Sequence, residues 1–189
     1  WRFARLDDGN LLPDDTSVWL EDDFQPGQIY EVIYRTRACP VVGVGLLAMR
    51  DATAFWRHAS AAEGNPSAGR IDHAYSFGIS QSGRFLREFI YQGLNLDEQG
   101  RPVFDGIIPH VAGARRGEFN QRYGQPSVQH VAGPAHLPPF ADDVQADPLT
   151  GHEDGLLRRQ RARGGVPRVF TINTSSEYWR IDSSLIHTD

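Results

Sequence analysis

The stretch that most constrains the fold runs from His73 to Gln92, where an apolar run meets a serine and a helical pattern begins directly after it. Gly78 lies two residues before Ser80, and Gly83 lies three residues after it. A sharp turn from a strand into a helix needs such small neighbours, because the backbone crosses closely on both sides of the serine. The segment therefore predicts a strand, a serine in a tight turn, and a helix.

This turn makes Ser80 a candidate nucleophile. The helix N-terminus would lie beneath the serine, so the amide of Gln81 can point at a developing oxyanion. The usual pattern is G-x-S-x-G, and here Ser82 holds the place of the second glycine. Ser82 is a weaker candidate, because it would lie half a turn into the helix without a glycine two residues before it. The alternative interpretation is a Ser/Gly-rich turn that carries no chemistry.

Composition indicates one globular domain over residues 1–189, because 40% of the residues are hydrophobic and that suffices for a core. The formal net charge of −5 implies no general attraction to nucleic acid or to an acidic membrane. All 19 cationic residues are scattered arginines, which excludes a lysine nucleophile or Schiff base within the chain. No apolar run approaches the roughly 18 residues of a membrane helix.

No metal or cofactor is expected. Cys39 is the only cysteine, so neither an internal disulfide nor a thiolate metal site can form, and we expect a small buried hydrophobe there. The acidic residues between Asp142 and Asp154 fit no EF-hand spacing, and we expect a solvated loop. The arginines at 158–163 lack aromatic support and a basic domain, so we expect a solvated surface.

The remaining patterns alternate strands with helices, which predicts an α/β fold with a mainly parallel sheet and helices on both faces. Strands are expected at 1–6, 17–20, 28–37, 74–79, 103–112 and 166–174. Helices are expected at 44–59, from Ser80 to near Gly93, and at 155–163. Residues 113–165 are rich in proline and glycine and form a long insertion, which we interpret as a lid over a pocket. A disordered insertion is the alternative.

A serine nucleophile needs a base and a carboxylate that orients the base. Glu177 follows the last expected strand, and in the chain order Ser, acid, His the acid belongs there. Asp182 is the alternate acid. Position alone is equally compatible with a surface glutamate at a strand end.

The histidine that would act as base is not evident. Of seven histidines only His187 follows Glu177, ten residues later, whereas the usual intervening crossover takes about a dozen residues. Either His187 is an unusual base or the base lies beyond Asp189 in a longer chain, which we favour. The N-terminus has neither a starting Met nor a signal-peptide pattern, which also favours a longer chain. His110 is expected in the core or pocket wall. The second oxyanion donor cannot be placed.

Several segments together resemble the alpha/beta hydrolase domain proteins, a poorly characterised branch of the α/β-hydrolase superfamily. They are residues 78–87, 103–106, 110–113 and 175–179, supported by 24–27, 30–31, 44–45 and 50–51. The resemblance implies an α/β-hydrolase fold, incomplete in this chain, and a serine hydrolase that acts on small carboxylic esters. It implies Ser80 as nucleophile and Glu177 as acid, with a histidine further towards the C-terminus. It does not identify the substrate.

Two other functions remain as alternatives. The first is an inactive hydrolase-fold fragment or binding module, because the sequence contains no well-placed catalytic histidine. The second is a dinucleotide-binding domain, because Gly43, Gly45 and Ala48 match G-x-G-x-x-A at the start of an expected helix. That fingerprint needs an acidic residue at the end of the next strand, and Asp72 stands at its start instead. Gly43 and Gly45 more simply allow a tight turn into the helix.

Overall fold

The computed structural model describes residues 1–35, 37, 41, 43–119, 139–147, 150–180 and 183–187, with the backbone alone for His187. The chain divides into two compact units, Trp1–Cys39 and Pro40–Asp189. The single domain expected over 1–189 stays a prediction.

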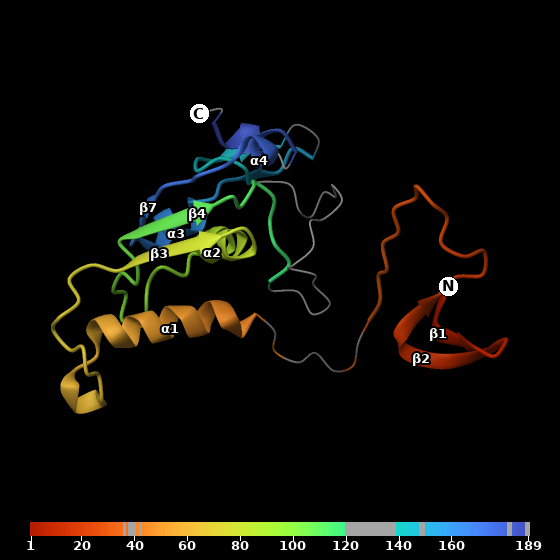
Figure 1. Cartoon of the computed structure of the whole chain (residues 1–189), viewed down its shortest axis with the longest axis horizontal. Helices are drawn as coiled ribbons and strands as arrows, with labels where there is room; N and C mark the ends of the chain where they lie inside the picture. The colour runs from red at the N-terminus through yellow and green to blue at the C-terminus, as the bar shows by residue number, and fades with distance from the viewer. Residues whose placement is uncertain are drawn as a thin grey trace. The chain divides into compact units, whose positions relative to one another are not determined.

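The first unit contains an antiparallel hairpin of β1 (Arg2–Asp7) and β2 (Asn10–Trp19) (Figure 1). Asp8 and Gly9 connect the two strands with φ values of 44° and 80°. Two successive positive φ values are typical of the tight hairpin turn that Asp-Gly favours. The sequence predicted two strands here, and β2 begins earlier than expected.

The strand expected at 28–37 is wrong for the described residues of that segment, which form no strand. Ile29 and Ile33 are 73% and 79% exposed. Strand propensity measures how well side chains fit a pleated, half-buried surface, so it needs a pairing partner. No described strand forms a β-ladder with this segment, and its β-branched residues alone do not make a strand.

The second unit is built on a parallel sheet of three strands in the order β3–β4–β7. These are β3 (Tyr75–Ile79), β4 (Gly106–His110) and β7 (Arg168–Val169). An isolated bridge pairs His110 with Ile172 and continues the β4–β7 alignment to the carboxyl end. The strand order and parallel pairing agree with the expected α/β class, although β4 and β7 are shorter than predicted.

Two helices pack around the hydrophobic core of this unit, and both lie where the sequence predicted them. They are α1 (Val44–His58) and α2 (Gln81–Tyr91) (Figure 1). The core joins Leu46 of α1 with Phe89 and Ile90 of α2 and Ile107 of β4, all of them at most 1% exposed. The alternate residues of β3 and β4 thus bury one face of the sheet against α2.

The opposite face of the sheet is not covered by the described residues. Tyr75, Phe77 and Ile79 alternate along β3 and are 67%, 58% and 52% exposed. The expectation of helices on both faces is therefore wrong for the described part of the chain. The apolar side chains of β3 thus lie on this open face, while Ser76 and Gly78, which alternate with them, are more buried. This is the reverse of the usual pattern, in which the apolar residues of a half-buried strand face the core.

The other elements are short. They are η1 (Ala61–Glu63), β5 (Gln145–Ala146), β6 (Glu153–Asp154), α3 (Arg158–Arg163), α4 (Ser175–Arg180) and η3 (Ser183–His187).

The buried guanidinium of Arg87, on α2, binds two parts of the insertion that we expected at 113–165, one at its start and one near its middle. It donates to the carbonyls of Ala114, Pro139 and Phe140 at 3.3, 3.5 and 3.4 Å. Burial lowers the pKa of Arg87 to about 10. Residues 120–138 and 148–149 lie outside the described residues, and the lid stays a prediction.

Tyr91 anchors the later part of this insertion to α2. Its ring lies between the guanidinium groups of Arg116 and Arg159, at 4.2 and 4.1 Å from the ring centre. Its hydroxyl donates to Asp154 Oδ2 at 2.8 Å, and Asp154 is 3% exposed. The solvated acidic loop expected here is therefore wrong for Asp154, because a long-range contact with α2 buries it.

We expect Asp154 to make the stability of the protein acid-sensitive. Burial opposes ionisation of Asp154, but hydrogen bonds from Gly155 and Tyr91 and the charge of Arg159 outweigh it and lower the pKa. A lowered folded-state pKa stabilises the protein above the unfolded-state value of about 3.9, and this stabilisation is lost as pH falls further. Asp154→Asn should cost about 1–3 kcal/mol at pH 7 and flatten the acid dependence. Urea unfolding between pH 7 and pH 3 measures both effects.

The control is Asp51→Asn, whose side chain is 57% exposed and which should keep the wild-type acid dependence. Equal acid dependence in wild type and Asp154→Asn would contradict the prediction.

Candidate functional site

Ser80 occupies the tight turn that the sequence predicts, directly between β3 and α2. Its backbone has φ 55° and ψ −114°, a region that residues other than glycine rarely adopt. The Ser80 amide donates to the His110 carbonyl at 2.9 Å, and the Ser80 carbonyl accepts from the Arg84 amide at 2.9 Å. The strained turn is thus held from β4 on one side and from α2 on the other.

Two glycines make this turn possible through close backbone contacts. A Cβ at Gly78 would lie 2.5 Å from the Ser82 carbonyl oxygen. A Cβ at Gly83 would lie 2.9 Å from the carbonyl oxygens of both Gly78 and His110. The second close approach therefore falls at Gly83 and not at Ser82, whose side chain is exposed. This explains why a serine is tolerated where the usual motif has a glycine.

Gln81 is the first residue of α2, and both Ser80 and Gln81 are exposed. The first amides of a helix have no partner within the helix and carry partial positive charge. The Gln81 amide therefore has the chemistry needed to stabilise an oxyanion formed at Ser80. That role stays a prediction, and the second donor is not identified.

Glu177 lies in the first turn of α4 and is half-buried. Its Oε2 accepts hydrogen bonds from the amide of Thr174, at 3.1 Å, and from the Thr174 hydroxyl. These bonds are typical of a capping box, in which a threonine precedes the helix and a glutamate is its third residue. The Thr174 hydroxyl bond is the main cause that lowers the pKa of Glu177, and the charge of His110 adds to it. Glu177 is therefore ionised at neutral pH.

Ser80 and Glu177 both follow strands at the carboxyl edge of the parallel sheet. Ser80 follows β3 directly, and the bridge between His110 and Ile172 brings the end of β4 beside the segment that leads to Glu177. In open α/β sheets, ligands bind at this edge. The sheet therefore brings the nucleophile and acid candidates to one edge.

Histidine remains the unassigned member of the set. The backbone of His187 ends η3, while its side chain and Asp182 lie outside the described residues. His110 lies at the edge of the site, 5.8 Å from the ring of Phe77, and its buried Nδ1 has no hydrogen-bond partner within the described chain. Sequence reasoning missed the role of Thr174, although the spacing T-x-x-E before a helix is a recognisable capping signal.

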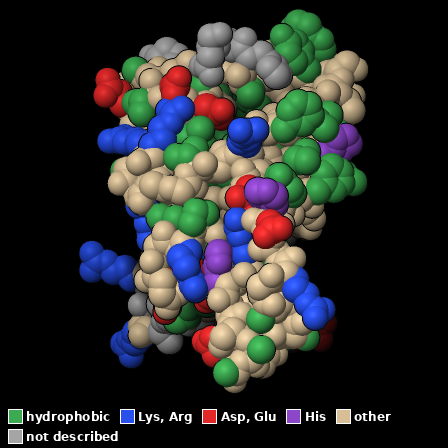
Figure 2. Space-filling model, turned by 90° about the vertical axis from the view of Figure 1, so that its left-hand side faces the viewer, with side chains coloured by type: hydrophobic (Ala, Val, Ile, Leu, Met, Phe, Trp, Pro, Cys, Tyr) green, Lys and Arg blue, Asp and Glu red, His purple; other side chains and the backbone are tan. Residues whose placement is uncertain are grey.

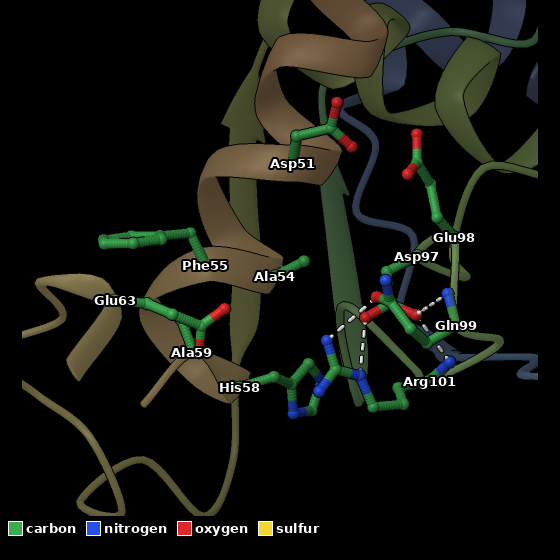
Figure 3. Close-up of a pocket in the computed structure, with 10 residues that line it drawn as sticks. All are labelled: Asp51, Ala54, Phe55, His58, Ala59, Glu63, Asp97, Glu98, Gln99 and Arg101. Carbon is green, nitrogen blue, oxygen red and sulfur yellow. Dashed lines mark hydrogen bonds and ion pairs between the residues drawn. The ribbon is translucent and has the colours of Figure 1, made fainter. Parts of the chain in front are cut away.

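Two pockets in the described part of the chain lie away from Ser80. One, of about 290 Å³, lies between α1 and the 97–101 turn, and Figure 3 shows Asp97 paired there with Arg101. Another, of about 440 Å³, is lined by His73, Tyr75 and Arg168 at the amino ends of the strands. Neither contains a residue of the Ser80 turn or of the Glu177 segment.

In the part of the chain that the structure describes, no cluster of side chains is suited to a metal ion, and no helix is long and apolar enough to cross a membrane. Figure 2 shows arginine and acidic side chains interspersed on the face it draws. Gly43 has φ 79° immediately before α1, which agrees with a tight turn into that helix, and a Cβ at Gly45 would meet nothing within 4 Å.

Gly78→Ala should disrupt the turn that holds Ser80. The added Cβ would overlap backbone atoms that cannot move aside, so we expect a loss of about 3 kcal/mol in the free energy of unfolding, at the upper end of the usual cost of overpacking. Gly45→Ala is the matched control, because it has open space and lies in α1. It should stabilise the protein by about 0.5–1 kcal/mol. Thermal unfolding of both variants tests these two predictions. Equal stability of Gly78→Ala and Gly45→Ala would contradict the role of Gly78 in the turn.

The comparison with known proteins agrees with this geometry. No curated protein and no solved structure matches the chain. The family model of the alpha/beta hydrolase domain matches residues 22–189, which contain the Ser80 turn, the parallel sheet and Glu177. The chain therefore belongs to the alpha/beta hydrolase domain family.

Proposed function

We propose that the protein is a serine hydrolase that cleaves small carboxylic esters, with Ser80 as its nucleophile. The observation that carries the proposal is the backbone of Ser80, at φ 55° and ψ −114° in a turn flanked by Gly78 and Gly83. A serine with only a structural role could take the ordinary backbone of a helix cap. The strained turn instead leaves Ser80 exposed at the carboxyl edge of the sheet, which suits attack on a bound substrate.

The mechanism is acyl transfer in two steps. Ser80 Oγ attacks the ester carbonyl while an imidazole takes its proton, and the Gln81 amide stabilises the negative oxygen that forms. The tetrahedral intermediate expels the alcohol, which receives the proton from the imidazole, and an acyl-enzyme remains. Water then attacks this ester by the same path and releases the acid.

Glu177 orients the imidazole. Its Oε2 is bound by Thr174, so the capping interaction holds the carboxylate in place, and we propose that Oε1 accepts the imidazole N–H. The lowered pKa of Glu177 keeps this acceptor charged. The base is either His187 or a histidine beyond Asp189 in a longer chain, as the sequence predicts.

The second candidate function is a binding module that retains the fold without the chemistry. Its support is the Thr174 contact, which gives Glu177 a structural role that needs no catalysis. The two functions differ in the reactivity of Ser80 towards a fluorophosphonate. Labelling of Ser80, read by mass spectrometry, is expected of the hydrolase and not of the binding module.

Ser80→Ala should lower p-nitrophenyl acetate hydrolysis about a thousandfold or more with little loss of stability. Ser82→Ala should retain activity, because Ser82 lies within the helix and contributes only its backbone to the turn. The opposite pattern would move the nucleophile to Ser82. The assay compares the 189-residue chain with one extended beyond Asp189. Activity of the shorter chain that is lost in His187→Asn would place the base at His187, and activity only in the longer chain would place it beyond.

Glu177→Gln should lower kcat by about a hundredfold or more, because the neutral amide stabilises an imidazolium poorly. Thr174→Val is the matched control for the capping role. It should cost about 1 kcal/mol of stability and lower kcat less than Glu177→Gln does, because the Thr174 amide still holds Oε2 of an ionised Glu177. Steady-state kinetics and thermal unfolding of both variants separate the roles. Equal losses of kcat in Glu177→Gln and Thr174→Val would show that Glu177 acts only through its capping contact and does not orient the imidazole.

A further inference from the structure

Val111 carries an unusual backbone next to the site. Its φ is 45°, and the other described residues besides glycine with positive φ are Asp8, Asp23 and Ser80. Aspartate tolerates this region, but a β-branched side chain there is strained. Such strain persists only where the surroundings hold the backbone, and it is found mainly at functional sites.

The hydrogen bonds around Val111 hold it between the two catalytic candidates. Its amide donates to the carbonyl of Ile172 at 2.7 Å, in the segment that leads to Glu177. The carbonyl of His110, the preceding residue, accepts from the Ser80 amide at 2.9 Å. Ile79 and His110 are aligned in the β3–β4 register, so Val111 follows β4 at the level where Ser80 follows β3.

The Val111 side chain is less buried than the residues that follow it in the turn. Ala112 and Ala114 are 2% and 1% exposed, and Gly113 between them is buried. Val111 itself is half-buried. Val111 is therefore the residue of this turn whose apolar side chain stays partly open to solvent, at the same end of the sheet as the exposed Ser80.

We propose that Val111 is a specificity-determining residue, whose isopropyl group forms an apolar wall beside Ser80 and limits the size of the acyl group that the site accepts. This inference rests on the ester hydrolysis proposed above. A glycine at this position would adopt the positive φ without strain. The presence of a valine therefore needs another explanation, which we place in its side chain. A branched side chain here would contact the acyl chain of an ester bound at Ser80 and disfavour bulky acyl groups.

The test compares p-nitrophenyl acetate with p-nitrophenyl pivalate, whose acyl group is branched. Val111→Gly should raise the pivalate-to-acetate ratio of kcat/KM about tenfold, the size of effect that methyl-sized changes in apolar pockets produce. Its melting temperature should not fall, because strain is removed. Val111→Ala keeps the strained backbone but shortens the side chain, and it should shift the ratio in the same direction.

Asp8→Gly is the matched control, because it relieves a similar φ of 44° in the β1–β2 turn. It should leave the ratio unchanged. A ratio within about twofold of wild type in both Val111 variants would overturn the role of Val111 while ester hydrolysis stands. A wild-type protein that neither hydrolyses the esters nor labels at Ser80 with a fluorophosphonate would overturn both the hydrolase and this role.

Discussion

The site depends on the close backbone crossing at Gly78, Ser82 and Gly83. Because no Cβ stands between them, the start of α2 lies against the end of β3 and the chain reverses direction at a single residue. That reversal gives Ser80 its positive φ. The hydrogen bond from the Ser80 amide to His110 ties the turn to β4, so the position of Ser80 is set by backbone contacts and not by its own side chain.

Several features that oppose folding lie at the carboxyl edge of the sheet. Ser80 and Val111 have strained backbones. The Nδ1 of His110 and both polar atoms of the Asn173 carboxamide are buried without a hydrogen-bond partner in the described part of the chain. Each such feature opposes folding, and proteins usually carry them at sites of function. The rest of the unit compensates with satisfied contacts, such as those of Arg87 with three carbonyls.

The part of the structure that could be predicted from the sequence depends on local signals. The strand, serine and helix around Ser80 follow from glycine spacing and periodicity over a short stretch, and α1 follows from periodicity alone. The strand expected at 28–37 failed because a strand depends on a partner elsewhere in the chain. Asp154 was assigned to solvent because its partner Tyr91 lies 63 residues away in the sequence. The cap of Thr174 on Glu177 was local and could have been found.

The capping contact of Glu177 is compatible with the catalytic role proposed for it, because both roles make the same physical demand. A carboxylate that orients an imidazole must stay ionised and must not rotate. The two donors of Thr174 meet both conditions, since they lower the pKa of Glu177 and fix one of its oxygens. Because the cap belongs to the first turn of α4, it also fixes where that carboxylate stands after β7. A capping contact and a catalytic orientation can therefore be one arrangement, in which the helix start serves as the support of the acid.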